Sequence, residues 1–189
     1  MMWVCMGSSS PFATVALFAD DKLVAAAGEN APMRASGAIL KLLERLLSET
    51  GKRISDIEVF AADLGPGSFT GVKVAVTLAK SLAFSLDKRA AGFSAFDLIA
   101  HGGTAAVPSR RGWYLLRKPD GEPLEVRSGD DRLKRAKGYG DAFETETLPL
   151  AERAEFASLH ALSPAALVPE YVLEPGTSLP KTPFAGGDN

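Results

Sequence analysis

The chain has 189 residues, of which 46% are hydrophobic and 23% charged, and 21 lysines and arginines nearly balance 23 aspartates and glutamates. These values are typical of a folded globular protein and exclude a disordered or fibrous chain. The formal net charge of -2 gives no global basic field, so contact with nucleic acid would need a local patch or a partner subunit. The single cysteine cannot form an intrachain disulfide, and no stretch reaches the ~20 apolar residues of a membrane helix. We therefore expect a cytoplasmic protein that is neither secreted nor membrane-spanning.

The first hundred residues predict a βββαβα order of elements. Short β-type runs separated by turns predict strands, and apolar residues at helical spacing predict helices. The predicted strands cover residues 3–6, 12–18, 22–27, 57–64 and 91–93, and the predicted helices cover 36–49, 69–86 and 95–101. We interpret this part, residues 1–103, as one lobe.

After Gly102-Gly103 the pattern is less regular. The segments 113–116 and 124–126 flank a turn and predict a hairpin. Further predictions are a helix at 151–162 and a final strand at 167–173. We therefore predict a reduced second lobe at 104–175 and a disordered tail at 176–189, which is rich in Pro, Gly and polar residues.

The predicted helix 69–86 is apolar around most of its circumference, with only a narrow polar stripe. Such a helix either lies at the centre of a core or covers a partner surface. The sequence leaves both interpretations open.

Few residues suggest catalytic or metal chemistry. His101 and His160 are far apart and lack the partners of a zinc site, and no Gly-x-Ser-x-Gly motif presents a nucleophile. The run 127–137 mixes both charge signs without aromatic residues, so it favours a solvated surface over an RNA platform. We predict no metal ligands and no catalytic residues.

The most informative segment is a glycine-rich loop between a predicted strand and a predicted helix. It consists of Gly65, Pro66, Gly67, Ser68, Phe69, Thr70 and Gly71. Such a loop can hold a phosphate on the free N–H groups of a helix start, or it can be a tight turn before a capped helix. Its spacing departs from both the P-loop and the dinucleotide-binding fingerprint, which favours the turn without excluding an anion site.

The segment 62–74, followed by Ala79-Lys80-Ser81-Leu82-Ala83, resembles the signature of the TsaB (YeaZ) family. Weaker similarity continues in Phe93-Ser94-Ala95-Phe96, Arg110-Arg111-Gly112-Trp113-Tyr114 and Pro169-Glu170-Tyr171-Val172-Leu173. The resemblance covers residues 3–173 and is strongest up to residue 100.

This resemblance implies an α/β fold of the actin-like, ribonuclease-H-like (ASKHA) class. It also implies a non-catalytic scaffold subunit in the synthesis of threonylcarbamoyladenosine on tRNA. Such a subunit pairs with a TsaD-like subunit and a TsaE-like ATPase, self-associates as a homodimer, and meets tRNA through the complex. The resemblance implies no intrinsic cofactor and leaves ATP at the subunit junction open.

In the family, pairing uses the first two helices. On the corresponding helices of this chain we predict partner contacts at Leu40, Leu43, Leu47, Val74, Leu78 and Lys80, without specifying which helix face meets the core.

The chain departs from the family at the end of its first strand. Gly7-Ser8 stands where the family has Asp-Thr, so the carboxylate that actin-like ATPases place near metal and phosphate is missing. The alternative function is an actin-like phosphoryl-transfer enzyme or nucleotide-binding protein that uses the 65–71 loop, with Asp63 or Asp20 near a metal. A peptidase function lacks a recognisable nucleophile or metal set.

Overall fold

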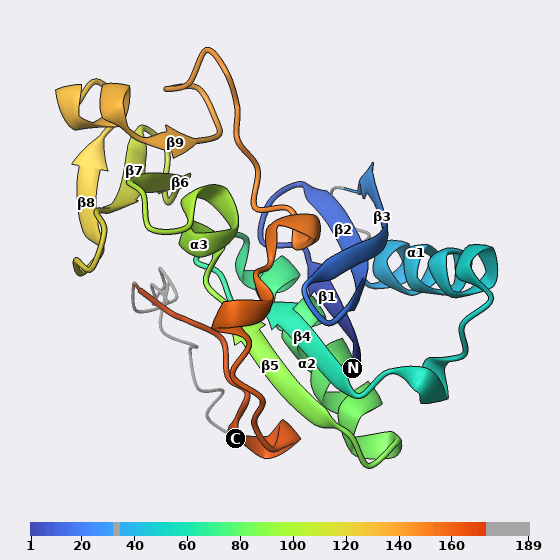
Figure 1. Ribbon diagram of the computed structural model, residues 1–189. Helices are drawn as coiled ribbons and strands as arrows, with labels where there is room; N and C mark the ends of the chain where they lie inside the picture. The colour runs from blue at the N-terminus through green and yellow to red at the C-terminus, as the bar shows by residue number, and fades with distance from the viewer. Residues whose placement is uncertain (32–34, 173–189) are drawn as a thin grey trace, which may run out of the picture.

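The computed structural model describes residues 1–31 and 35–172, so the predicted tail at 176–189 lies outside the described residues. Two sheets form two lobes (Figure 1). The first sheet has the order β3-β2-β1-β4-β5. Its strands are β1 (Met2–Gly7), β2 (Phe12–Ala19), β3 (Lys22–Asn30), β4 (Val59–Asp63) and β5 (Arg89–Phe93).

The first sheet is mixed: β1, β2 and β3 are joined by antiparallel pairings, and β1, β4 and β5 by parallel pairings. β1 pairs antiparallel with β2 and parallel with β4, and β4 continues parallel with β5. The elements up to residue 85 follow the predicted βββαβα order, and the predicted strand at 91–93 and helix at 95–101 follow as Arg89–Phe93 and Ala95–Ala100. The strand order agrees with the predicted actin-like, ribonuclease-H-like α/β class.

Alternation along β1 divides the core into two layers. Val4 and Met6 join one hydrophobic cluster, and Trp3 and Cys5 join the other, because successive side chains of a strand point to opposite faces. Trp3 stacks on Phe18 with ring centroids 4.0 Å apart.

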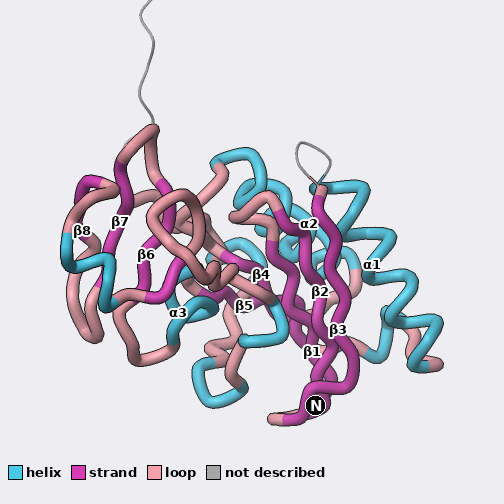
Figure 2. The backbone as a smooth tube through the Cα atoms, turned by 90° about the horizontal axis from the view of Figure 1, so that it is seen from above, coloured by secondary structure: helices cyan, strands magenta, loops and turns pink. Residues whose placement is uncertain are grey.

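Helices α1 (Ala35–Thr50) and α2 (Phe69–Ser85) cover the first face of the sheet (Figure 2). Helix α3 (Ala95–Ala100) contributes Leu98 to the opposite face. Within the described ranges, no helix is long and apolar enough to span a membrane.

The second sheet has the order β8-β7-β6-β9. Its strands are β6 (Ala105–Pro108), β7 (Trp113–Arg117), β8 (Leu124–Arg127) and β9 (Lys137–Gly138). The predicted hairpin is confirmed as β7 and β8. The sequence did not predict β6 and β9, which are too short to show a period-2 pattern.

The predicted helix at 151–162 is wrong. This segment forms two 3-10 turns, Ala151–Arg153 and Phe156–Ser158, and an isolated bridge between Leu162 and Ala90. The N–H of Ala151 donates to Thr14 Oγ1 at 3.1 Å, so contacts with the first sheet replace the hydrogen bonds of a regular helix.

The predicted strand at 167–173 is also wrong over its described residues, 167–172, which lie outside both sheets. Leu167 enters the core beside α2, and the N–H of Glu170 donates to the carbonyl of Leu64 at 2.8 Å. The segment makes single contacts with the first lobe and, in these described residues, no ladder of strand hydrogen bonds.

These contacts correct the predicted domain limits. Residues 151–172 return to the first lobe, whereas the second sheet ends with β9 at Gly138 (Figure 1). The second lobe is therefore shorter than the predicted 104–175, and the first lobe is built from two separate parts of the chain.

Candidate functional site

The glycine-rich loop packs directly against the turn that follows β1. The N–H of Ser68 donates to the carbonyl of Ser9 at 2.6 Å, and Ser8 Oγ donates to the carbonyl of Gly71 at 2.8 Å. These bonds join the ends of the two neighbouring parallel strands β1 and β4. The loop and the turn therefore form one structural unit at this edge of the sheet.

The close approach of the two segments explains the last glycine of the loop. A Cβ atom at Gly71 would lie 1.8 Å from the carbonyl oxygen of Ser8, which is far inside van der Waals contact. Only glycine allows the backbones to approach this closely without displacing one of them.

Three N–H groups of the loop bind within the chain. Gly65 N–H donates to Asp63 Oδ1 at 2.9 Å, Ser68 N–H to Ser9, and Gly71 N–H to the capping Ser68 Oγ at 3.2 Å. A phosphate cradle would need such groups to be free. The geometry therefore favours the capped turn over the anion site.

Asp63 is fully buried at the end of β4. Its Oδ1 accepts from Gly65 N–H at 2.9 Å and its Oδ2 from Ser9 N–H at 3.3 Å. Burial raises the pKa of Asp63 to about 6, against the opposing effect of the hydrogen bonds from Ser9 and Gly65. Gly7 lies beside this carboxyl, since a Cβ at Gly7 would be 3.4 Å from Asp63 Cβ.

The raised pKa predicts a pH-dependent stability. The unfolded carboxyl titrates near 3.8 and the folded one near 6, so the native state binds more protons between these values. The free energy of unfolding should therefore fall by about 2–3 kcal/mol as the pH rises from 4 to 7. Urea unfolding at several pH values should detect this decrease in the free energy of unfolding of the unmodified chain. The Asp63→Asn variant should not show the decrease. Asp21→Asn, at an exposed carboxyl, should leave the fall unchanged; an equal fall in Asp63→Asn would show that another group causes it.

The two acidic residues considered for a metal lie apart. Asp20 is at the β2–β3 turn, where its Oδ1 accepts from the Met1 amine at 2.7 Å. That turn is at the opposite end of the sheet from Asp63, because Met2 pairs with Ala19 and Met6 with Ala62. The structure does not bring Asp20 to the loop. Across residues 1–31 and 35–172, no three His, Cys, Asp or Glu side chains form a potential metal-binding group.

A cleft of about 790 Å³ lies between the two lobes. The first lobe contributes Ser9 and Ser68 beside the glycine loop, and the second lobe contributes Trp113 and Tyr139. Arg110, Arg111, Asp141 and Glu146 place both charge signs on its walls. The sequence did not reveal this cleft, because its walls come from segments distant in the chain.

The six predicted partner residues divide into three groups. Leu43 and Leu47 are only 2% and 9% exposed and belong to the core, which corrects their assignment as partner contacts. They face inward because α1 presents its apolar stripe to the sheet.

Lys80 lies on the side of α2 that contacts residues 164–166 of the same chain, and its Nζ donates to the carbonyl of Ala165 at 3.4 Å. Leu40 is 40% exposed, and Val74 and Leu78 are half-buried against the core. These three apolar residues keep side-chain surface that a partner could reach, and Lys80 is partly exposed as well.

The final described segment also reaches the loop. The ring of Tyr171 lies 5.5 Å from that of Phe69, and Lys73 Nζ lies 4.0 Å above the Phe69 ring. The sequence gave no signal for this contact beyond the aromatic residue in the final motif.

Comparisons with known proteins match this chain to a TsaD family and to TsaB proteins. The family described as "TsaD: tRNA N6-adenosine threonylcarbamoyltransferase" matches residues 29–110. The chain is 30% identical over 102 residues to the Escherichia coli (strain K12) tRNA threonylcarbamoyladenosine biosynthesis protein TsaB. It is 32% identical over 89 residues to the Bacillus subtilis (strain 168) protein of the same name.

The sequence matches cover only part of this chain, whereas the structural match covers most of it. They cover 54% and 47% of this chain but only 44% and 39% of the two relatives, so the chain spans less than half of their length. The structure of YeaZ from Pseudomonas aeruginosa is similar with a TM-score of 0.70 at 20% identity, covering 90% of this chain and 99% of that one. At this identity the likeness establishes a shared fold. The chain is therefore similar to TsaB proteins in sequence over about half of its length and to YeaZ in fold.

Proposed function

We propose that this chain is a non-catalytic scaffold subunit in the synthesis of N6-threonylcarbamoyladenosine on tRNA. The names of its TsaB relatives support a role in threonylcarbamoyladenosine biosynthesis. The match to the TsaD family supports a TsaD-like partner. In this proposal a TsaE-like ATPase joins the pair, tRNA is met through the complex, and the free chain forms a homodimer.

The observation that carries the pairing is the outer surface of α1 and α2. The two helices pack side by side on one face of the sheet. Leu40 of α1 is 40% exposed, Phe69 of α2 46% and Phe84 of α2 82%. Leucine and phenylalanine side chains at such exposure on one pair of helices favour burial by a partner.

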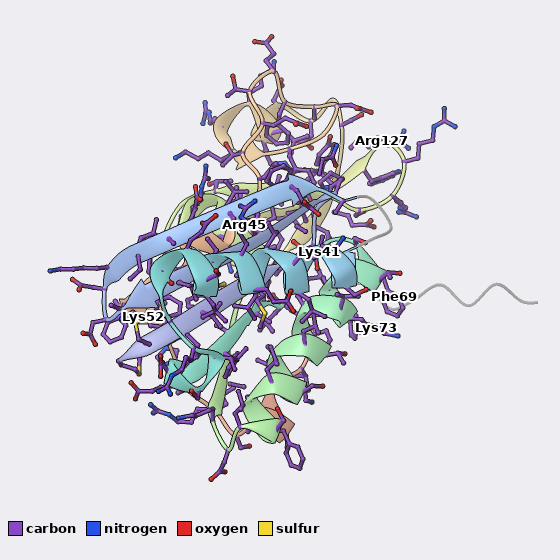
Figure 3. The ribbon with its side chains drawn as sticks, turned by 90° about the vertical axis from the view of Figure 1, so that its right-hand side faces the viewer. Lys41, Arg45, Lys52, Phe69, Lys73 and Arg127 are labelled. Atoms are coloured by element: carbon purple, nitrogen blue, oxygen red, sulfur yellow. The ribbon has the colours of Figure 1, made fainter. Side chains whose placement is uncertain are left out.

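Charged side chains flank these apolar positions. Figure 3 shows Lys41 and Arg45 on α1 and Lys73 near Phe69 at the start of α2, all at the surface. This mixture of apolar positions and a polar rim is typical of interfaces that form between separately folded subunits.

The geometry around Asp63 supports the non-catalytic part of the proposal. Its carboxylate is held by the chain's own Ser9 and Gly65, and Gly7 supplies no second carboxylate beside it. The buried Asp63 then serves to join the loop to the β1 turn.

The cleft between the lobes favours a second candidate, a nucleotide-binding or phosphoryl-transfer protein. Ser68 at the start of α2 lines a cleft of about 790 Å³, a suitable size for a small ligand. ATP turnover by the purified chain that is lost in Asp63→Asn would favour this candidate. Absence of ATP turnover would exclude phosphoryl transfer as the function of the chain.

The proposed pairing is tested by size exclusion coupled to light scattering. The chain is measured alone and mixed with its cognate TsaD-like protein at micromolar concentration, with and without ATP. We expect a homodimer that is replaced by a heteromer. A chain that remains unchanged by the TsaD-like protein would refute the proposed pairing.

A matched pair of leucine variants locates the surface. Leu40→Glu should weaken pairing by about tenfold or more, because a charge would be buried at the interface. Leu23→Glu, at a leucine of β3 that is 50% exposed, should pair like the unmodified chain. Equal pairing of both variants would place the partner elsewhere.

A further inference from the structure

Two arginines stack on one tryptophan in the second lobe. The guanidinium carbons of Arg110 and Arg127 lie 4.7 and 5.0 Å from the ring centroid of Trp113. Arg110 precedes β7 and Arg127 ends β8, so the hairpin brings them together. These cation–π contacts hold both guanidinium groups against the indole ring.

The neighbouring carboxylates are already paired. Glu125 accepts from Arg110 Nη2 at 3.1 Å, and Asp130 accepts from Arg132 Nη2 at 2.6 Å. Arg111 and Arg127 are exposed, and neither has a carboxylate within 4.0 Å among residues 1–31 and 35–172. These two guanidinium groups therefore carry the positive charge that remains free in this cluster.

The arginines line a groove. A hollow of about 700 Å³ lies over the β7–β8 hairpin and is bordered by Arg111, Trp113 and Arg127. The carboxylates of Glu125 and Asp130, which are paired with Arg110 and Arg132, also line it. It shares Arg111, Gly112, Trp113 and Ser128 with the cleft between the lobes. The two hollows therefore adjoin each other at the tryptophan.

We propose that this groove binds a single-stranded segment of RNA, an inference that rests on the proposed role in tRNA modification. Arg111 and Arg127 bind phosphates, and a base stacks on the indole of Trp113 or on a guanidinium plane. Proteins recognise unpaired RNA through this combination of aromatic stacking and arginine contacts. Asp141 and Glu146 on the cleft wall repel phosphates, so the backbone of the strand follows the hairpin side.

The sequence alone disfavoured an RNA platform because the 127–137 run contains no aromatic residue. The fold supplies the missing aromatic from β7. Trp113 packs beside Arg127 although 14 positions separate them in the chain (127 minus 113).

Binding can be measured by fluorescence anisotropy of a labelled single-stranded oligoribonucleotide at several salt concentrations. We expect Arg127→Glu to weaken binding by about tenfold or more and to reduce the salt slope by about 0.7 for one lost phosphate contact. Trp113→Leu should weaken binding by about tenfold through lost stacking. Lys52→Glu is the matched control, since it makes the same charge change at an exposed site on the first lobe (Figure 3).

Tryptophan fluorescence gives a second readout. The chain has two tryptophans, and Trp3 is fully buried, so quenching by the oligonucleotide would report on Trp113. Quenching that is lost in Arg127→Glu would support the groove directly.

Several outcomes would overturn the inference. Equal losses in Arg127→Glu and Lys52→Glu would indicate non-specific attraction by charge alone. Displacement of the oligonucleotide by inorganic tripolyphosphate at equal phosphate concentration would assign the groove to a small anion. Unchanged binding in Arg127→Glu would place any RNA contact elsewhere.

The same preparations are tested for pairing with the TsaD-like protein. If the chain pairs with the TsaD-like protein but shows no Arg127-dependent RNA binding, the proposal that the groove binds RNA is refuted and the proposed function stands. Arg127-dependent RNA binding without pairing would refute the proposed pairing and keep the groove.

Discussion

Gly71→Ala is expected to lower the free energy of unfolding by about 3 kcal/mol or more. Gly71 is the third residue of α2, and a Cβ there would lie 1.8 Å from the carbonyl oxygen of Ser8. The two backbones must separate, which breaks the bond from Ser8 Oγ to Gly71 and strains the bond from Ser68 to Ser9. Urea unfolding followed by circular dichroism measures the loss.

Gly37→Ala is a control for which the expected change in the free energy of unfolding has the opposite sign. Gly37 also lies in a helix, α1, but a Cβ there would meet no atom within 4 Å. Because alanine favours the helix, Gly37→Ala should raise the free energy of unfolding by up to ~1 kcal/mol. If both substitutions are stabilising, the loop and the β1 turn do not approach as closely as described.

Leu43→Glu is expected to abolish folding, whereas Leu40→Glu should leave the fold intact. Leu43 is 2% exposed inside the core cluster and Leu40 is 40% exposed on the same helix. Burying an unpaired carboxylate and losing the packing of a core leucine together cost more than about 4 kcal/mol, a large part of the stability of a small domain.

Circular dichroism and soluble yield distinguish the two leucine variants. Leu43→Glu should lack a cooperative unfolding transition, and Leu40→Glu should unfold within about 1 kcal/mol of the unmodified chain. If Leu40→Glu also fails to fold, its side chain contributes to the core and cannot serve as a probe of pairing. If Leu43→Glu folds normally, the orientation of α1 is wrong.

The first lobe could be predicted from the sequence because its elements have clear local signals. Short apolar runs bounded by turns identified β1 and β2, and the spacing of Ile39, Leu42 and Leu46 identified α1. The second lobe has weaker signals, since β6 and β9 are only 4 and 2 residues long. Residues 151–172 could not be predicted because their shape depends on single contacts with β2, β5 and the loop after β4.

The candidate site was predicted only in part. The loop from Gly65 to Gly71 was identified by its motif, but its N–H groups proved to bind Ser9, Asp63 and Ser68 within the chain. The family resemblance implied α1 and α2 as partner-binding candidates, and helical spacing did not show which side of each helix meets the sheet. Leu43 and Leu47 were therefore assigned wrongly as contacts.

The sequence by itself determined the order of elements in the first lobe, the position of the glycine-rich loop before a helix and the resemblance to the TsaB (YeaZ) family, because each depends on residues close together in the chain. Only the tertiary structure decided which face of α1 is buried, that Asp63 is enclosed beside Gly7, and that Trp113 meets Arg127. These features depend on contacts between distant segments. Local periodicity specifies that a helix or strand has an apolar face, whereas packing selects what that face touches.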